Sequence, residues 1–167
     1  MSSSPTDLAL PNAGPGPDPF TIGDDPADAR VVVLLFQRDH YCRNCRNQVR
    51  RIGDRYEEFT DQDAAVVSII PESVNRAQDW VERYDLPYPV LADPDHRAAE
   101  SFDQPVRFGA LGELHDVIGR MPLTVLQGRT KEGRSRIQTV SGRTPGDRPD
   151  VDALLAMIDN LDTSIPS

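Results

Sequence analysis

The sequence predicts an α/β domain with a central mixed β-sheet and helices on both faces. Two apolar runs rich in β-branched residues, 31–36 and 64–70, read as buried strands, and each is followed by apolar residues at helical spacing. The chain then ends with two strand-like runs around a short turn and an amphipathic segment at 151–161. Strands that alternate with helices favour parallel pairing, and a terminal hairpin adds antiparallel strands, so the predicted sheet is mixed.

Length and composition predict a single folded domain with short appendages. The 167 residues are enough for one domain with a substantial core. Residues 1–19 are rich in Ser, Pro and Gly, which predicts a flexible or surface-hugging arm. The expected organisation is therefore a flexible arm at 1–19, a domain at 20–162 and a C-terminal tail at 163–167.

The negative net charge of the chain limits the kinds of molecule that it is expected to bind. With 18 Lys and Arg against 27 Asp and Glu, the formal net charge is −9, and Lys131 is the single lysine. This composition argues against nucleic acid or an anionic membrane as partner. It is typical of halophilic proteins, in which salt screens self-repulsion, and ordinary solubility with codon bias explains it equally well. No secretory signal or membrane-spanning apolar run is apparent, so we expect a cytoplasmic protein.

The first half of the predicted domain surrounds the cysteines. An edge strand is expected at 20–22 and a fully buried strand at 31–36. The helix that follows the cysteines has one apolar face, formed by Val49, Ile52, Tyr56 and Phe59. A second buried strand at 64–70 is stopped by Pro71.

The second half supplies further helices and the terminal hairpin. Ser73 is the expected N-cap of a helix with apolar residues Ala77, Trp80, Val81 and Tyr84, and a short strand follows at 87–91. Asp93 and Pro94 predict the start of a short helix that continues to Phe102. Beyond a loop at 103–119, strands are expected at 123–126 and 135–140 around a turn at 128–133, and a helix at 151–161.

Both cysteines of the chain lie in one C-x-x-C motif, Cys42-Arg43-Asn44-Cys45, between a predicted strand and a predicted helix. A free thiol with a pKa of about 8.5 is mostly protonated at neutral pH, whereas the positive end of a helix lowers that pKa to about 3.5–7.5. Arg38, Arg43 and Arg46 lie close in sequence and would add to the effect. The motif therefore predicts a reactive thiol pair, and Asp39 and Tyr41 precede it as residues that tune proton transfer or shape the loop.

Two other interpretations of the motif are inert buried thiols and half of a metal site. A structural zinc ion needs four ligands, and besides its cysteines the chain offers only three histidines, at His40, His96 and His115. A mixed site with His40 is possible, but redox chemistry is the favoured interpretation. We therefore expect no metal and no other cofactor.

The order of strand, C-x-x-C and helix, followed by Met121-Pro122-Leu123-Thr124 before a hairpin and a last helix, resembles the thioredoxin fold. More specifically, the chain resembles the C-x-x-C branch of the peroxiredoxins, in the alkyl hydroperoxide reductase and thiol-specific antioxidant superfamily, and is similar to its haloarchaeal members. The segments that carry this resemblance are 34–48, 66–73, 79–95 and 142–158.

The resemblance implies roles for individual residues. Cys45 falls on the peroxidatic position, Cys42 on the family's threonine and Arg38 on its proline. The family's active-site arginine would fall at Met121 or Pro122, with Arg120 close by. Pro122 falls on the cis-proline that faces the cysteines in this fold, and we group it with Tyr41 and Asp39 as candidate substrate-binding residues.

These roles imply an antioxidant enzyme that reduces peroxides. The Cys45 thiolate would attack the peroxide, Cys42 would condense with the resulting sulfenic acid, and a thioredoxin-like donor would reduce the disulfide. The first alternative is a thioredoxin-like reductase that acts on a disulfide substrate, with Cys42 as the exposed nucleophile and Cys45 as the resolving thiol. The second is a redox- or metal-sensing binding module that does not turn over. The oligomeric state is left open.

Overall fold

The computed structural model describes residues 8–22, 29–38, 41–101, 123–130, 133–141 and 149–161, and its centre is a five-stranded sheet. The strand order is β5-β4-β3-β6-β7. Pairs β3–β4 and β4–β5 are parallel, and pairs β3–β6 and β6–β7 are antiparallel, so the predicted mixed sheet is confirmed. Its strands are β3 (Val31–Phe36), β4 (Ala64–Ile70), β5 (Val90–Ala92), β6 (Leu123–Thr130) and β7 (Gly133–Ser141).

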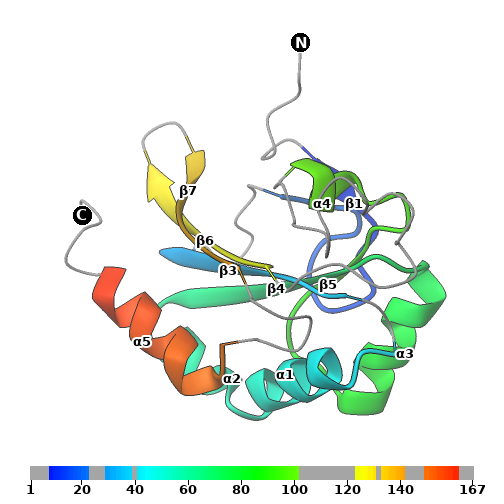
Figure 1. The fold of residues 1–167 in the computed structure, drawn as a ribbon, viewed down its shortest axis with the longest axis horizontal. Helices are drawn as coiled ribbons and strands as arrows, with labels where there is room; N and C mark the ends of the chain where they lie inside the picture. Colours follow the sequence, from blue (N-terminus) through cyan, green and yellow to red (C-terminus); the bar gives the residue numbers. More distant parts are fainter. Residues whose placement is uncertain are drawn as a thin grey trace.

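Helices cover both faces of this sheet, as expected (Figure 1). One face packs against four helices, which are α1 (Arg43–Asp54), α2 (Tyr56–Asp61), α3 (Val74–Tyr84) and α5 (Val151–Leu161). The other face packs against the short α4 (Arg97–Ser101) and a small hairpin of β1 (Ala9–Leu10) and β2 (Phe20–Thr21). None of the described helices is long and apolar enough to cross a bilayer.

The central strand β3 joins the two halves of the core. All six of its residues are buried, and alternate side chains point to opposite faces. One set, Val31, Val33 and Leu35, packs in the core that also contains Cys42 and Cys45. The other set, Val32, Leu34 and Phe36, packs with the β1–β2 hairpin and α4. Burial of each such side chain contributes about 1.5–3 kcal/mol, so β3 is firmly held and fixes where the cysteine loop starts.

Residues 8–19, expected to be part of a flexible arm, belong instead to the folded unit. Ala9 and Leu10 pair with Thr21 and Phe20, and Leu10 is buried. The connecting segment lies along the sheet edge, where the Ala13 N–H donates to the Val90 carbonyl at 2.9 Å. Of the two alternatives expected for the arm, residues 8–19 thus follow the surface-hugging one and not the flexible one. The edge strand expected at 20–22 is confirmed as β2.

Several helix boundaries differ from the prediction. The single helix expected after the cysteines is interrupted at Arg55, which has φ −117° and ψ 24°, so it becomes α1 and α2. Gly53 and Asp54 are poor helix formers just before this break. The next helix, α3, begins as predicted after Ser73, whose side chain accepts a hydrogen bond from the Arg76 N–H. The final helix at 151–161 is confirmed as α5.

The helix predicted to begin at Asp93 and Pro94 starts later, at Arg97. The Asp93 carboxylate is 1% exposed and accepts hydrogen bonds from the N–H groups of Arg97, Ala98 and Ala99. It therefore caps the helix as expected, but from four residues upstream. The short strand expected at 87–91 is observed at 90–92, and the strands of the last hairpin are longer than predicted. The expected loop at 103–119 and the tail at 163–167 lie outside the described residues.

Candidate active site

The two cysteines lie where α1 begins, as predicted. Cys42 is the N-cap residue of this helix, with extended backbone angles of φ −63° and ψ 110°. Its sulfur accepts a hydrogen bond from the Cys45 N–H at 3.2 Å, which satisfies one of the free amide groups of the first turn. The strand β3 ends at Phe36, so only a short loop separates the central strand from the thiols.

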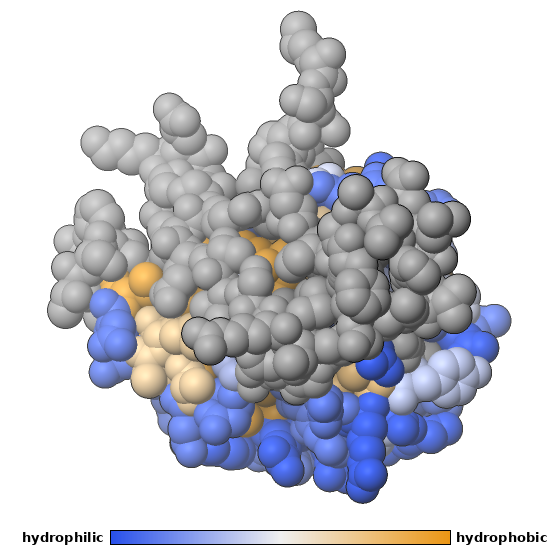
Figure 2. All heavy atoms as spheres, viewed as in Figure 1, coloured by the Kyte–Doolittle hydropathy of each residue, from blue (hydrophilic) through white to orange (hydrophobic). Residues whose placement is uncertain are grey.

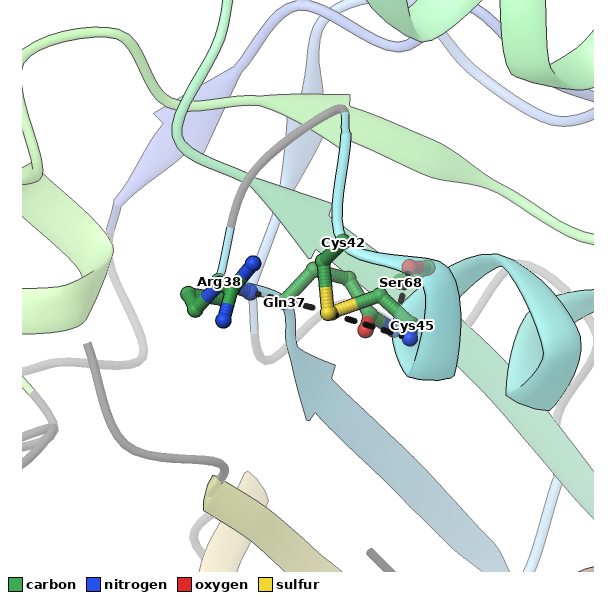
Figure 3. The surroundings of a disulfide bond; sticks show 5 residues. All are labelled: Gln37, Arg38, Cys42, Cys45 and Ser68. Atoms are coloured by element: carbon green, nitrogen blue, oxygen red, sulfur yellow. Dashed lines mark hydrogen bonds between the residues drawn. A yellow bond between two sulfur atoms is a disulfide. The ribbon is translucent and has the colours of Figure 1, made fainter. Parts of the chain in front are cut away.

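Cys42 and Cys45 are joined in a disulfide, with their Cα atoms 5.2 Å apart (Figure 3). The Cys45 sulfur accepts a hydrogen bond from the Arg38 N–H at 3.4 Å. Each sulfur thus accepts a hydrogen bond from a backbone N–H group, that of Cys45 in the first turn of α1 for the Cys42 sulfur and that of Arg38 after β3 for the Cys45 sulfur. Because such groups favour the thiolate over the thiol, this geometry suits both sulfurs for redox chemistry after reduction.

Both cysteines are buried, whereas a thioredoxin-like mechanism requires an exposed nucleophilic cysteine. Cys42 is 2% exposed and Cys45 is 0% exposed in the disulfide form, so the expected exposed Cys42 is not observed. The physical reason is that the Cys42 side chain turns inward to cap α1, and both cysteines pack in the core cluster with Leu35 and Val49. In the disulfide form the two cysteine residues are therefore almost closed to solvent.

Tyr41, one of the predicted site residues, lies immediately before the disulfide and is 66% exposed. It is the only exposed large hydrophobic side chain among the described residues. The guanidinium carbon of Arg76, in the first turn of α3, lies 4.8 Å from the centre of the Tyr41 ring. Such a cation–π contact orients the ring over α3 without burying it.

A buried polar pair lies beside the disulfide, and our sequence analysis does not single it out (Figure 3). The Gln37 amide donates to the Ser68 hydroxyl at 3.0 Å, and neither residue is exposed. The Gln37 N–H also donates to the Ile69 carbonyl at 2.8 Å. These bonds fix the chain as it leaves β3. The sequence does contain a signal for this pair: Ser68 is the one polar residue in the apolar run 64–70. A hydroxyl buried in a strand needs a hydrogen-bond partner, so a polar side chain was to be expected next to it.

The structure thus brings together three of the six predicted site residues, Tyr41, Cys42 and Cys45. The other three, Asp39, Arg120 and Pro122, lie outside the described residues. So do two of the three histidines considered as metal ligands, His40 and His115. Over the described ranges, no group of three or more His, Cys, Asp or Glu side chains is placed to hold a metal ion.

Comparison with known proteins identifies a family and several relatives of this chain. The AhpC/TSA family matches residues 11–111. Peroxiredoxin Bcp of Bacillus subtilis (strain 168) is 28% identical over 74 residues, which are 44% of this chain and 47% of that protein. The chain therefore spans about half the length of this relative. The putative peroxiredoxin YkuU of the same organism is 28% identical over 139 residues, which cover 79% of this chain and 71% of YkuU.

Solved structures show the same fold at lower identity. The bacterioferritin comigratory protein of Xanthomonas campestris superimposes with a TM-score of 0.74 at 18% identity, over 94% of this chain and 93% of that one. Peroxidoxin BcpB of Mycobacterium tuberculosis gives 0.71 at 20% identity, over 96% and 94%. The predicted thioredoxin-like architecture is thereby confirmed, whereas the similarity to haloarchaeal members stays a prediction. From the family match over residues 11–111 and the disulfide at the start of α1, we conclude that this chain belongs to the AhpC/TSA family.

Proposed function

We propose that this protein is a thiol peroxidase in which Cys45 is the peroxidatic cysteine and Cys42 the resolving cysteine. The observation that supports this most is the position of Cys45 in the first turn of α1, with its disulfide partner at the N-cap of the same helix. Family membership supplies the class of reaction, and the local geometry supplies a resolving thiol that needs no large unfolding to react.

The proposed oxidative steps conserve atoms and electrons. The Cys45 thiolate attacks one oxygen of a hydroperoxide, and the O–O bond breaks as an S–O bond forms. Cys45 becomes a sulfenic acid, and the other oxygen leaves as an alkoxide or hydroxide that takes up a proton. The Cys42 thiolate then attacks the sulfenic sulfur, which forms the disulfide and releases hydroxide, protonated to water.

Reduction of the disulfide returns the enzyme to its starting state. A thiolate of a thioredoxin-like dithiol donor attacks one sulfur, forming a mixed disulfide, and the second thiol of the donor completes the exchange. The donor loses two electrons and becomes a disulfide. We place this cycle in the cytoplasm, because a reducing compartment maintains such donors.

Further residues have proposed roles that follow from the resemblance and their place in the sequence. Arg120 would stabilise the departing oxygen, and Pro122 would face the sulfurs and contact substrate. Asp39 and Tyr41 would assist proton transfer at the loop before the thiols. Because Cys42 and Cys45 are nearly inaccessible in the disulfide form, we also propose that the segment around Tyr41 moves during each cycle.

One observation favours a second candidate function, a general disulfide reductase. The Cys42 sulfur accepts the Cys45 N–H at 3.2 Å, and this bond would stabilise a Cys42 thiolate as the nucleophile of a thioredoxin-like exchange. In that case a protein disulfide, and not a peroxide, would be the substrate.

Two assays on matched variants separate the candidates. Peroxide consumption with dithiothreitol as donor is expected for the native protein and is expected to be lost in Cys45→Ser. Cys42→Ser is expected to keep oxidation of Cys45 and to lose disulfide formation. Reduction of insulin disulfides that disappears in Cys42→Ser, together with no peroxide consumption by the native protein, would replace the peroxidase with the reductase.

A further inference from the structure

The outer face of α1 carries a concentration of positive charge. Arg43, Arg46 and Arg50 recur at helical spacing on one side of the helix, and Arg51 lies next to them. With four arginines and one aspartate, α1 has a net charge of +3, in a chain whose net charge is −9. We call Arg43, Arg46 and Arg50 the arginine face.

These arginines are not neutralised by neighbouring carboxylates. Among the described residues, Arg55 pairs with Glu58 and Asp152, Arg76 with Glu72, and Arg83 with Asp79. No ion pair with a described carboxylate involves any residue of the arginine face. An acidic protein offers many carboxylates for pairing, so three guanidinium groups on one helix that no described carboxylate pairs are available to an external partner.

The arginine face is also concave. Its three arginines, with Asn47 of the same helix and Tyr84 at the end of α3, line a surface hollow of about 160 Å³. In Figure 2 the surface in the region of α1, at the lower edge of the view, is strongly hydrophilic. Like charges around a hollow repel one another, and an anionic side chain entering it relieves that repulsion.

The hollow lies close to the disulfide along the same helix. Arg43 follows Cys42 directly and Arg46 follows Cys45. On the other side of Cys42, the exposed ring of Tyr41 is oriented by Arg76. Tyr and Arg are the residue types that most often dominate the energetics of protein interfaces.

We propose that the arginine face, with Tyr41 at its edge, docks an acidic dithiol protein that reduces the Cys42–Cys45 disulfide. This proposal rests on the proposed function in one respect, namely that the Cys42–Cys45 disulfide is the bond that a partner reduces. A thiolate of the partner attacks one sulfur of the disulfide, the S–S bond breaks, and a mixed disulfide forms. The partner's second thiolate then releases the remaining sulfur, so the partner is oxidised and its two protons end on Cys42 and Cys45.

The net charge of the chain does not prevent this docking. At physiological ionic strength the Debye length is about 8 Å, so carboxylates far from α1 are largely screened at the docking site. Local charge complementarity then sets the encounter rate, which it raises by about 10- to 1000-fold in favourable cases. Guanidinium groups also hold carboxylates in two-point contacts, which fix the orientation of the partner.

The test uses the oxidised full-length protein and synthetic dithiol peptides with one Cys-Gly-Pro-Cys centre, flanked by glutamates, glutamines or lysines. The rate of disulfide reduction is followed by quenched alkylation and mass spectrometry at about 0.15 M salt, where the Debye length is about 8 Å, after circular dichroism has shown a folded protein. We expect the acidic peptide to react at least about tenfold faster than the basic one, because charge steering has this magnitude. The ratio is expected to fall toward one as salt increases.

Variants locate the effect on α1. The variant Arg50→Glu, in the arginine face but not adjacent to either cysteine, is expected to weaken the peptide preference, while the matched control Arg97→Glu, on α4 at the opposite face of the sheet, keeps it. The rate with dithiothreitol, a small dithiol without charged flanking residues, is expected to be the same in the native protein and in both variants. A loss with dithiothreitol as large as the loss with the acidic peptide would overturn the proposal, because the arginines would then act on the disulfide itself.

Equal rates for the three peptides with the native protein would also overturn it. None of these readouts needs peroxide turnover. A protein that prefers the acidic peptide but consumes no peroxide would therefore refute the proposed peroxidase and support the docking surface. A protein that consumes peroxide but reacts equally with all three peptides would support the peroxidase and refute the docking surface.

Discussion

At the scale of single residues, the site depends on two sulfurs and the amide groups that face them. The position of the thiols at a helix start was predictable, because a C-x-x-C between a buried apolar run and helical spacing has few other placements. Their burial was not, because it depends on the tertiary packing of Cys42 and Cys45 against core residues such as Leu35 and Val49. The Gln37–Ser68 bond joins residues 31 positions apart, which no local pattern reveals.

Tyr88 gives a prediction about pH at this same scale. Its hydroxyl is buried and donates to the Val49 carbonyl at 2.6 Å, and burial raises its pKa well above the ordinary value of 10.0. Burial raises the pKa of the neighbouring Tyr56 as well. In the pH range above about 10 the unfolded chain releases these protons and the folded chain keeps them, so the free energy of unfolding falls as pH rises.

Tyr88→Phe removes one of these groups. At neutral pH the variant is expected to be less stable by about 1 kcal/mol, because one buried hydrogen bond is lost. Above pH of about 10, its stability is expected to fall less steeply than that of the native protein. Urea unfolding at a series of pH values measures both effects, and parallel curves for the two proteins would contradict the assignment.

At the scale of elements, the N-terminal hairpin is the clearest departure from the sequence-based expectation. Its Pro- and Gly-rich connection was predicted to be an arm, because the residues that hold it are far apart in sequence. Asn12 organises the connection: its amide oxygen accepts from Gly14 and Val90, and its amide nitrogen donates to the carbonyls of Pro15 and Pro17. Residues 12 and 90 are 78 positions apart.

Asn12→Ala is therefore expected to destabilise the protein by about 3 kcal/mol, since several buried hydrogen bonds are lost together. Chemical denaturation of the variant measures the change. The matched control Pro11→Ala alters an exposed side chain next to it and is expected to stay within about 0.5 kcal/mol of the native protein. Equal stability of Asn12→Ala and the native protein would show that the hairpin does not depend on this side chain.

At the scale of the whole molecule, a chain with a net charge of −9 places a buried redox pair at the start of α1, which among the described helices is the one with a net positive charge. The mixed sheet and its helices were predictable, because runs such as 31–36 and 64–70 and the spacing of α5 leave little choice of element. The helix break at Arg55 was not predicted, because the apolar spacing from Val49 to Phe59 favours one continuous helix and outweighed the poor helix formers Gly53 and Asp54 just before the break. The helical spacing of Arg43, Arg46 and Arg50 is visible in the sequence, but the hollow that they line with Tyr84 is visible only once α1 and α3 are packed together.

The net charge of −9 predicts a dependence of stability on salt. Self-repulsion among carboxylates is screened as the Debye length falls to about 3 Å in 1 M salt, so the unfolding temperature is expected to rise from low to molar potassium chloride. Differential scanning calorimetry over that range tests this expectation. An unfolding temperature that does not change with salt would leave ordinary solubility as the explanation of the composition.

The most direct test of the account is to oxidise the reduced protein with one equivalent of peroxide and to identify the modified sulfur by mass spectrometry, in the native chain and in both single Ser variants. The account predicts an intramolecular disulfide in the native protein, a sulfenic acid on Cys45 in Cys42→Ser, and no oxidation at matched times in Cys45→Ser. First oxidation at Cys42, or no reaction of either sulfur, would contradict it.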